Sequence, residues 1–304
     1  MFIKEENALM ISQNRDLDMC NGPLFSKILI FALPIMAMNM LQLLFNAADM
    51  VVVGRFSGSE ALGAVGATGS LINLIVNLFM GLSVGTSVIM AQDYGAGKPI
   101  EISCSVHTSI SISIIAGIIV MAAGLILCEP LLNIMGTPED IIHLSVLYMK
   151  IYFIGLPASM VYNFCAAILR AIGDSRRPMN FLIISGIVNV MLNLLFVIVL
   201  NMSVKGVAWA TVISQYLSML LVLNCLYKTD RAIRFTPQNL CIDRQKLKEI
   251  LKIGLPAGMQ SMLFSISNVL IQSAVNSFGS VMVAASSAAG NIEGFVGTTM
   301  NAYY

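Results

Sequence analysis

The stretch LPIMAMNMLQLLFNAADMVVVG, residues 33–54, decides the fold because it returns in altered form as LPAGMQSMLFSISNVLIQSAVN at residues 255–276. With a constant offset of 222 positions, residues 28–56 and 250–278 share nine identities, which include a Leu-Pro pair and an Asn twelve residues after the proline. Duplicated membrane halves are the usual construction of secondary transporters. We therefore predict a duplicated membrane protein. The second copy extends only to Tyr304, the counterpart of Leu82, so we expect most of it to be missing.

The composition indicates an integral membrane protein. Hydrophobic residues make up 57% of the chain and charged residues only 11%, with a mean hydropathy of +0.84, which is too apolar for a soluble domain. The first 20 residues are charged and lack an apolar core, so we expect no cleavable signal peptide and an N-terminus in the cytoplasm. The six cysteines are scattered without a CxxC pair, and the two histidines are far apart. We expect neither disulfides nor a cofactor.

Eight apolar stretches are long enough to cross the roughly 30 Å hydrocarbon core of a bilayer as helices. They cover residues 25–53, 61–91, 102–127, 141–169, 179–200, 206–227, 249–276 and 281–304. We predict an all-α integral membrane protein made of a cytoplasmic segment 1–24, a six-helix first lobe 25–227, a linker 228–248 and two helices of a second lobe, 249–304. Because an even number of helices precedes the linker, the second copy has the same orientation as the first and the repeat is parallel.

Basic residues predict the orientation. With the N-terminus inside, 14 of the 17 Lys and Arg residues fall on the cytoplasmic side, and only Arg55, Lys150 and Lys205 fall on the outer side. This bias follows the positive-inside rule. We expect a multi-pass protein of the plasma (inner) membrane with its linker in the cytoplasm.

Asp49 is the clearest charge within a predicted span. Burying an ionised group in hydrocarbon costs at least a few kcal/mol, so such residues are functional candidates. Asp49 comes late in an inside-to-outside helix, which places it in the outer half of the membrane. Desolvation favours the protonated acid, so Asp49 could carry a proton; a bound cation or neighbouring amides could instead hold a carboxylate. Its counterpart in the second copy is Ile271, so the acid belongs to the first lobe alone.

Three polar side chains on later spans could join Asp49. Asn189 and Asn193 are four residues apart and so lie on one face of the fifth span, and Thr211 adds a hydroxyl from the sixth. A hard cation such as sodium selects oxygen ligands of this kind. Amides at helical spacing more often serve only to bond neighbouring helices, and the pattern alone favours that interpretation.

Four short motifs follow one another along the chain. They are Leu33-Pro34 followed by DMVVVG at 49–54, AQDYGAG at 91–97, LRAIGD at 169–174 with Pro178, and GVAWAT at 206–211. In their order and spacing they resemble the MATE family, the multidrug and toxic compound extrusion transporters, from Pro23 onward. The third motif looks like the LRxxGxxxxP loop of that family.

This resemblance implies a twelve-helix antiporter whose two six-helix lobes form a V-shaped cavity and export amphipathic, often cationic compounds against entry of Na⁺ or H⁺. It implies a cation site in the first lobe, to which Asp49, Asn189, Asn193 and Thr211 correspond one by one. Asn193 departs from the family, since many members carry a second Asp there, so the site has one protonatable group fewer. Since we predict eight spans and the resemblance implies twelve helices, we expect a family member that is truncated after the eighth helix.

Four further side chains are expected to line the substrate cavity: Gln42, Gln260, Asn268 and Glu293. Cation binding at Asp49 from outside would lower the affinity for bound substrate and drive alternating access. The expected partners are small amphipathic or cationic molecules and the lipid bilayer, without nucleic acid, and the expected state is a monomer.

Three alternatives belong to other classes. A flippase for a lipid-linked precursor would share the architecture but needs a cationic cavity, and the spans carry little positive charge. A membrane-embedded enzyme would need paired Asp-rich motifs or a Ser/His pair, neither of which is visible in the sequence, so we expect no enzymatic activity. The third alternative is an incomplete gene product that is inactive alone, because one lobe and two helices cannot enclose the cavity of the family.

Overall fold

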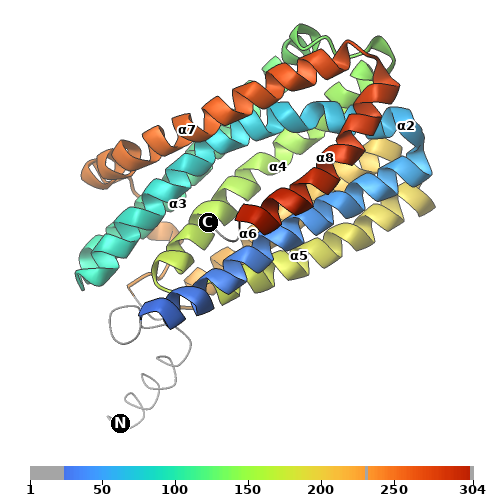
Figure 1. Ribbon diagram of the computed structural model, residues 1–304. Helices are drawn as coiled ribbons and strands as arrows, with labels where there is room; N and C mark the ends of the chain where they lie inside the picture. The colour runs from blue at the N-terminus through green and yellow to red at the C-terminus, as the bar shows by residue number, and fades with distance from the viewer. Residues whose placement is uncertain (1–23, 230–231, 302–304) are drawn as a thin grey trace.

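The computed structural model is a bundle of long helices that run up and down past one another (Figure 1). It describes residues 24–229 and 232–301. The helices are α2 (Leu24–Gly95), α3 (Pro99–Ile134), α4 (Glu139–Ala171), α5 (Arg176–Leu194), α6 (Ser203–Tyr227), α7 (Arg244–Asn276) and α8 (Ser280–Asn301), with a π-helical turn η1 (Leu195–Val199) and a 3-10 turn η2 (Pro237–Asn239). These two ranges contain no strand, and the predicted all-α fold is confirmed.

Helix α2 contains the first two predicted spans, because the chain turns back on itself at Gly58. This residue has φ 89° and ψ 177°, a backbone conformation that a side chain would disfavour and glycine tolerates. The first segment of α2, residues 24–57, therefore lies antiparallel to the second, residues 59–95 (Figure 1).

The remaining predicted spans each correspond to a helix, with α5 extended through η1. By length and apolar composition, five helices of the described part can cross a membrane, namely α2 to α6, of which α2 holds two spans. Helices α7 and α8, which hold the seventh and eighth predicted spans, fall outside this group. In α7, amides such as Gln260 and Asn268 lower the hydropathy. The predicted segment 1–24, apart from Leu24, and residues 302–304 lie outside the described residues. The division into two lobes at the linker stays a prediction.

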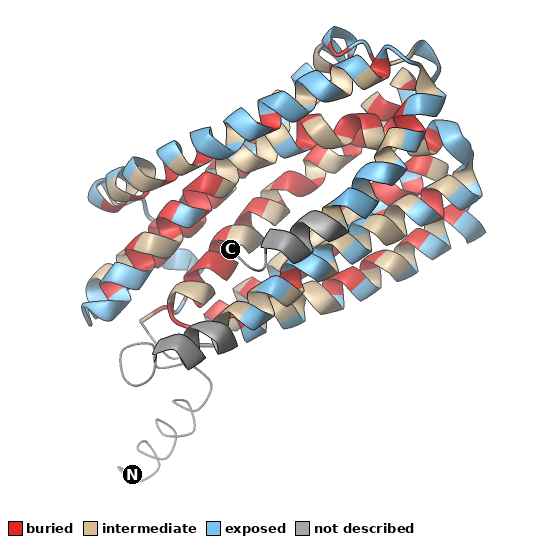
Figure 2. Ribbon diagram, viewed as in Figure 1, coloured by how far each residue is buried: buried red, intermediate tan, exposed pale blue. Residues whose placement is uncertain are grey.

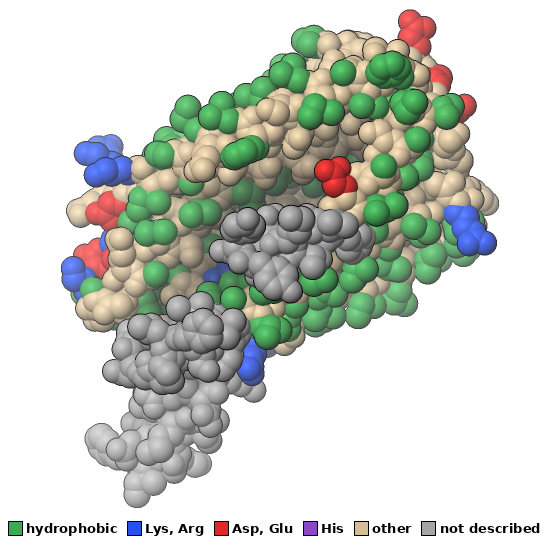
Figure 3. All heavy atoms as spheres, in the orientation of Figure 1, with side chains coloured by type: hydrophobic (Ala, Val, Ile, Leu, Met, Phe, Trp, Pro, Cys, Tyr) green, Lys and Arg blue, Asp and Glu red, His purple; other side chains and the backbone are tan. Residues whose placement is uncertain are grey.

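Helix α4 is the central element and packs against α2, α3 and α6. It is the most deeply buried of the candidate spans (Figure 2). Its fully buried Phe153, Leu156 and Phe164 fill the interior. Hydrophobic side chains also cover much of the visible outer face, while the visible Lys and Arg lie near its two ends (Figure 3). A protein surrounded by lipid has this distribution.

The loops fall at two opposite ends of the bundle (Figure 1). The end that we call the linker end carries residues 96–98 and 172–175 and, from the predicted linker, residues 228–229 and 232–243. The far end carries the turn at Gly58 and residues 135–138, 200–202 and 277–279. Each helix therefore connects the two ends, as the alternation of predicted spans requires.

Candidate cation site

The first segment of α2 and helix α5 lie close enough for their polar side chains to meet. Gly186 makes this possible, because a Cβ atom at this position would lie 1.9 Å from Cε2 of Phe45. Asp49 follows Phe45 by one helical turn, and Asn189 follows Gly186 by nearly one turn. The contact between Gly186 and the Phe45 ring thus brings the two polar positions to the same level of the bundle.

Asn193 forms the centre of the polar cluster. Its Nδ2 donates hydrogen bonds to Oδ1 of Asp49 and, at 3.2 Å, to Oδ1 of Asn189. Asn193 is 1% exposed, Asn189 is 5% exposed, and Asp49 is partly buried. A single amide therefore bridges an acid of α2 and an amide of its own helix.

The cluster offers oxygen atoms to a positively charged ligand. The carboxylate of Asp49 and Oδ1 of Asn189 face the Asn193 amide group, and Oδ1 of Asn193 is buried without a hydrogen-bond partner among the described residues. A buried acceptor without a partner is costly. A cation bound at this cluster would interact with these oxygen atoms, whose capacity to accept hydrogen bonds the protein leaves partly unused.

Thr211 stands apart from these three residues. Its hydroxyl donates to the carbonyl oxygen of Val207 on its own helix, α6, at 3.0 Å. Within the described ranges no hydrogen bond joins Thr211 to Asp49 or to either asparagine. Three of the four predicted ligands are therefore in contact, and the place of Thr211 in the site stays a prediction.

The four side chains expected to line a substrate cavity are all exposed: Gln42, Gln260, Asn268 and Glu293. No hydrogen bond joins them to one another in the part of the chain that the structure describes. A different polar pair connects α2 and α7, in which Nδ2 of Asn77 donates to Oγ of Ser265 at 2.9 Å. The substrate-binding role of the four residues stays a prediction.

Two features beside the site were not predicted. One is the close approach at Gly186, and the other is the π-helical turn η1, which begins two residues after Asn193. Such turns often occur at functional sites because they change the direction of side chains. A single sequence reveals neither feature, because Gly186 is one glycine in an apolar run and the residues of η1, LFVIV, are all apolar.

A bundle of apolar helices that holds an acid against two buried amides defines a class of protein, the helical membrane proteins with an internal polar site. The family follows from comparison with known sequences: the model of the MatE family matches residues 34–195, just over half of the chain. The chain belongs to this family, and the predicted resemblance is confirmed. It is a multi-pass membrane protein.

Curated relatives agree with this assignment. The probable multidrug resistance protein YoeA of Bacillus subtilis is 31% identical over 276 residues, which are 88% of this chain and 59% of that protein. The probable multidrug resistance protein YpnP of the same organism is 33% identical over 270 residues, again 88% of this chain and 59% of the relative. The chain thus spans about three fifths of the length of these relatives.

A solved structure has the same fold. It is described as the inward-facing conformation of a multidrug resistance MATE family transporter of the MOP superfamily. It is 27% identical, with a TM-score of 0.75, and the match covers 86% of this chain and 61% of that one. The helical bundle described above is therefore the fold of this family over most of the chain.

Proposed function

We propose that the chain provides the ion-coupling part of an efflux transporter that exports amphipathic, often cationic compounds in exchange for Na⁺ or H⁺. The observation that carries the proposal is the bridge from Asp49 through Asn193 to Asn189, an acid and two amides held between α2 and α5. The multidrug resistance proteins among its relatives support the class of substrate. Small amphipathic molecules, rather than macromolecules, are then its cargo.

Coupling follows from the chemistry of Asp49. Either a proton or Na⁺ would neutralise its carboxylate, and the charged form is the stronger acceptor for the Asn193 amide. Neutralisation would therefore weaken the hydrogen bond that joins α2 to α5. A change in the packing of these two helices would alter the rest of the first lobe and release the substrate. In the proposed orientation the linker end faces the cytoplasm, and ions reach Asp49 from outside.

The oxygen atoms of the cluster are suitable ligands for a sodium ion as well as acceptors for a proton. Asp49 and Asn189 supply two side-chain oxygens, and the oxygen of Asn193 is buried without a described partner. Oxygen ligands of this type suit hard cations. These residues would hold the ion, and Asp49 alone would supply the charge that balances it.

The test measures cation binding by the purified chain in detergent. A ligand that binds the folded state raises its thermal stability, so replacing choline chloride with NaCl, or lowering the pH, should raise the Tm. The Asp49→Asn variant should lose both responses, whereas Glu60→Gln, which removes an exposed acid of the same helix, should keep them. Equal responses in Asp49→Asn and the unsubstituted chain would exclude Asp49 as the coupling site.

The second measurement is export of ethidium, a cationic amphipathic dye, from proteoliposomes with an imposed Na⁺ or H⁺ gradient. Export by the unsubstituted chain and by Glu60→Gln, together with its loss in Asp49→Asn, would support coupled efflux. Dye export that persists in Asp49→Asn and still depends on the gradient would contradict the proposal.

A further inference from the structure

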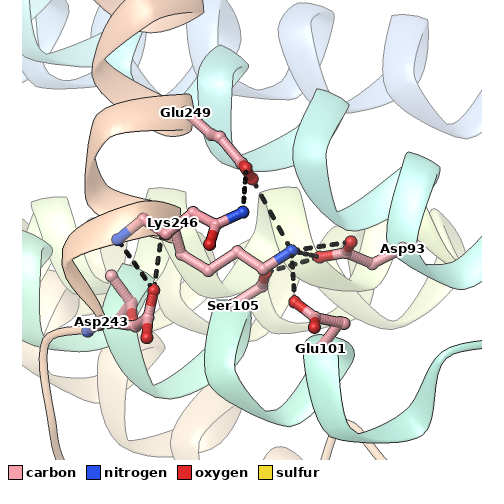
Figure 4. Close-up of polar contacts among 8 residues, drawn as sticks. Asp93, Glu101, Ser105, Asp243, Lys246 and Glu249 are labelled. Atoms are coloured by element: carbon pink, nitrogen blue, oxygen red, sulfur yellow. Dashed lines mark hydrogen bonds and ion pairs between the residues drawn. The ribbon is translucent and has the colours of Figure 1, made fainter.

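An ion-pair cluster around the buried Lys246 joins the start of α7 to α2 and α3 at the linker end. Lys246, in the first turn of α7, is 6% exposed. Its ammonium Nζ lies 2.8 Å from both carboxylate oxygens of Asp93 in α2 and 2.9 Å from Oε2 of Glu101 in α3. Lys246 points between these two acids in Figure 4, with Glu249 at 3.7 Å. One lysine therefore connects α7 to two helices of the first lobe.

One acid of this cluster, Asp93, also accepts a hydrogen bond from α3. Oγ of Ser105 donates to Oδ2 of Asp93 at 2.7 Å, and Ser105 is fully buried. Burial acts to lower the pKa of Lys246, but its hydrogen bonds to Asp93 and Glu101 raise the pKa above the ordinary value for lysine. The ammonium form is thus the stable one. Without it, neighbouring carboxylates would repel each other.

The linker before α7 is fixed to the same surface of the first lobe. The backbone N–H of Thr236 donates to Nε2 of His107 at 3.2 Å, and that of Asp243 donates to Oγ1 of Thr108 at 3.1 Å. Asp243 in turn caps α7, since its side chain accepts from the backbone N–H groups of Gln245 and Lys246. Polar side chains of α3 therefore hold the linker, and the linker holds the start of α7.

Deeper in the bundle, the contact between α2 and α7 has a different character. Gly81 and Gly85 of α2 meet Gly254 and Gly258 of α7 so closely that a Cβ atom at Gly81 would lie 2.1 Å from the backbone nitrogen of Gly258. This contact carries no charge, and apolar side chains beside the glycines, such as Leu82 of α2 and Ile250 of α7, pack in the same cluster. The ionic attachment of α7 to α2 is therefore concentrated at the linker end, about two helical turns before Gly254.

We infer that Lys246, Asp93 and Glu101 form a latch that closes the linker end between the two lobes and must open when that end becomes accessible. The function of the latch in alternating access rests on the proposed transport, but its existence as a contact between lobes does not. Release of the ammonium exposes the acids of the first lobe to water, which stabilises the separated state. The latch can thus open without leaving charges buried and unpaired.

Hydrogen exchange tests the latch. In Lys246→Gln, the backbone amides of residues 235–250 should exchange at least tenfold faster than in the unsubstituted chain. The matched control is Lys248→Gln, which removes an exposed lysine from the same helix and should change exchange less than twofold. Reversing the pair, with Asp93→Lys and Lys246→Asp together, should restore protection. Equal exchange in Lys246→Gln and the unsubstituted chain would overturn the latch.

A distance measurement separates opening of the lobes from local fraying of α7. Spin labels at positions 98 and 244, both exposed, should give a longer and broader distance distribution in Lys246→Gln, provided that the native cysteines are replaced by serine. Faster exchange with an unchanged distance would mean that only the first turn of α7 unfolds, which contradicts the latch. If Lys246→Gln does not fold, the milder Glu101→Gln serves in both measurements, with smaller changes in the same direction expected.

Neither measurement uses transport or cation binding. Failure of the latch would therefore leave the role of Asp49 untouched, and failure of the Asp49→Asn test would leave the latch untouched.

Discussion

Asn193 determines how charge is held in the candidate cation site. Its amide donates to Asp49 and to Asn189, so an uncharged group meets the acid. A neutral partner can bridge two acceptors without adding charge to a buried place. The site therefore has a single carboxyl group, Asp49, and one proton or one monovalent cation is enough to balance its charge.

The Asn193→Asp substitution should place a second carboxyl group beside Asp49. Two carboxylates in a buried site repel each other, so we expect the variant to unfold at a lower Tm than the unsubstituted chain in sodium-free buffer at pH 8. Added NaCl should raise its Tm by more than it raises that of the unsubstituted chain. Asn201→Asp, at an exposed loop position of the far end, is the control and should leave both values nearly unchanged. A Tm of Asn193→Asp that is unchanged without sodium would contradict the assigned position of residue 193.

Asp49 could be singled out from its own stretch of sequence, but the residues of the latch could not. Asp49 interrupts an apolar run, whereas the pattern of Asn189 and Asn193 fits an ordinary contact between helices, and only the family resemblance placed them beside Asp49. Lys246 and Asp93, by contrast, are 153 positions apart and lie in segments whose charges look like ordinary solvated residues. Sequence patterns within one helix report burial of that helix, whereas pairing between distant helix ends depends on how the helices are packed.

At the scale of elements, glycines determine how closely the helices approach. At the seam between the second segment of α2 and α7, backbone meets backbone at Gly81 and Gly258. The helices themselves could be predicted because apolar runs of sufficient length determine them. Their neighbours could not, since glycine inside a membrane helix can mark either a contact or an open surface.

Gly81→Ala should therefore destabilise the chain, although alanine favours the helical state. Backbone atoms of α7 cannot rotate away as a side chain can, so forcing the helices apart should cost about 1–3 kcal/mol. Gly69→Ala, in the same helix but with nothing within 4 Å of the added Cβ, is the control and should be neutral or stabilising by up to ~1 kcal/mol. Thermal unfolding, monitored by circular dichroism, compares the stability of the two variants. An equal effect of the two substitutions would contradict the tight seam.

At the scale of the whole molecule, α7 is tied to the first lobe at both ends. At the far end, Nδ2 of Asn276 donates to the carbonyl oxygen of Met135 at 3.0 Å. At the linker end, Lys246 makes the ionic contacts described above. A neutral hydrogen bond can be exchanged with water more readily than a buried ion pair. The two ends should therefore open under different conditions.

The latch should persist as the pH is raised from 7 to 9. The titratable groups around Lys246 are Asp93 of α2, Glu101 and Cys104 of α3, and Asp243 and Glu249 beside it. A lysine whose pKa is raised by folding adds stability that is fully present below the unfolded pKa, about 10.4, and is lost only as the pH rises through the higher folded value. Hydrogen exchange of residues 244–250, corrected for the intrinsic rate, should stay within twofold over this range. Loss of protection by pH 9 would show that the acids do not hold the ammonium.

The bridge between Asp49 and Asn193 also has a consequence for biosynthesis. The two residues are 144 positions apart, and at roughly 5–20 residues per second the ribosome needs about 7–29 s to make the chain between them. During that time the first helix must enter the bilayer with its acid still lacking the later amide. The antiparallel second segment of α2, joined to the first through Gly58, can insert with it as a hairpin and supply apolar surface meanwhile. The second segment of α2 is thus already present when the first helix inserts, and the contact between Asp49 and Asn193 forms only when α5 arrives.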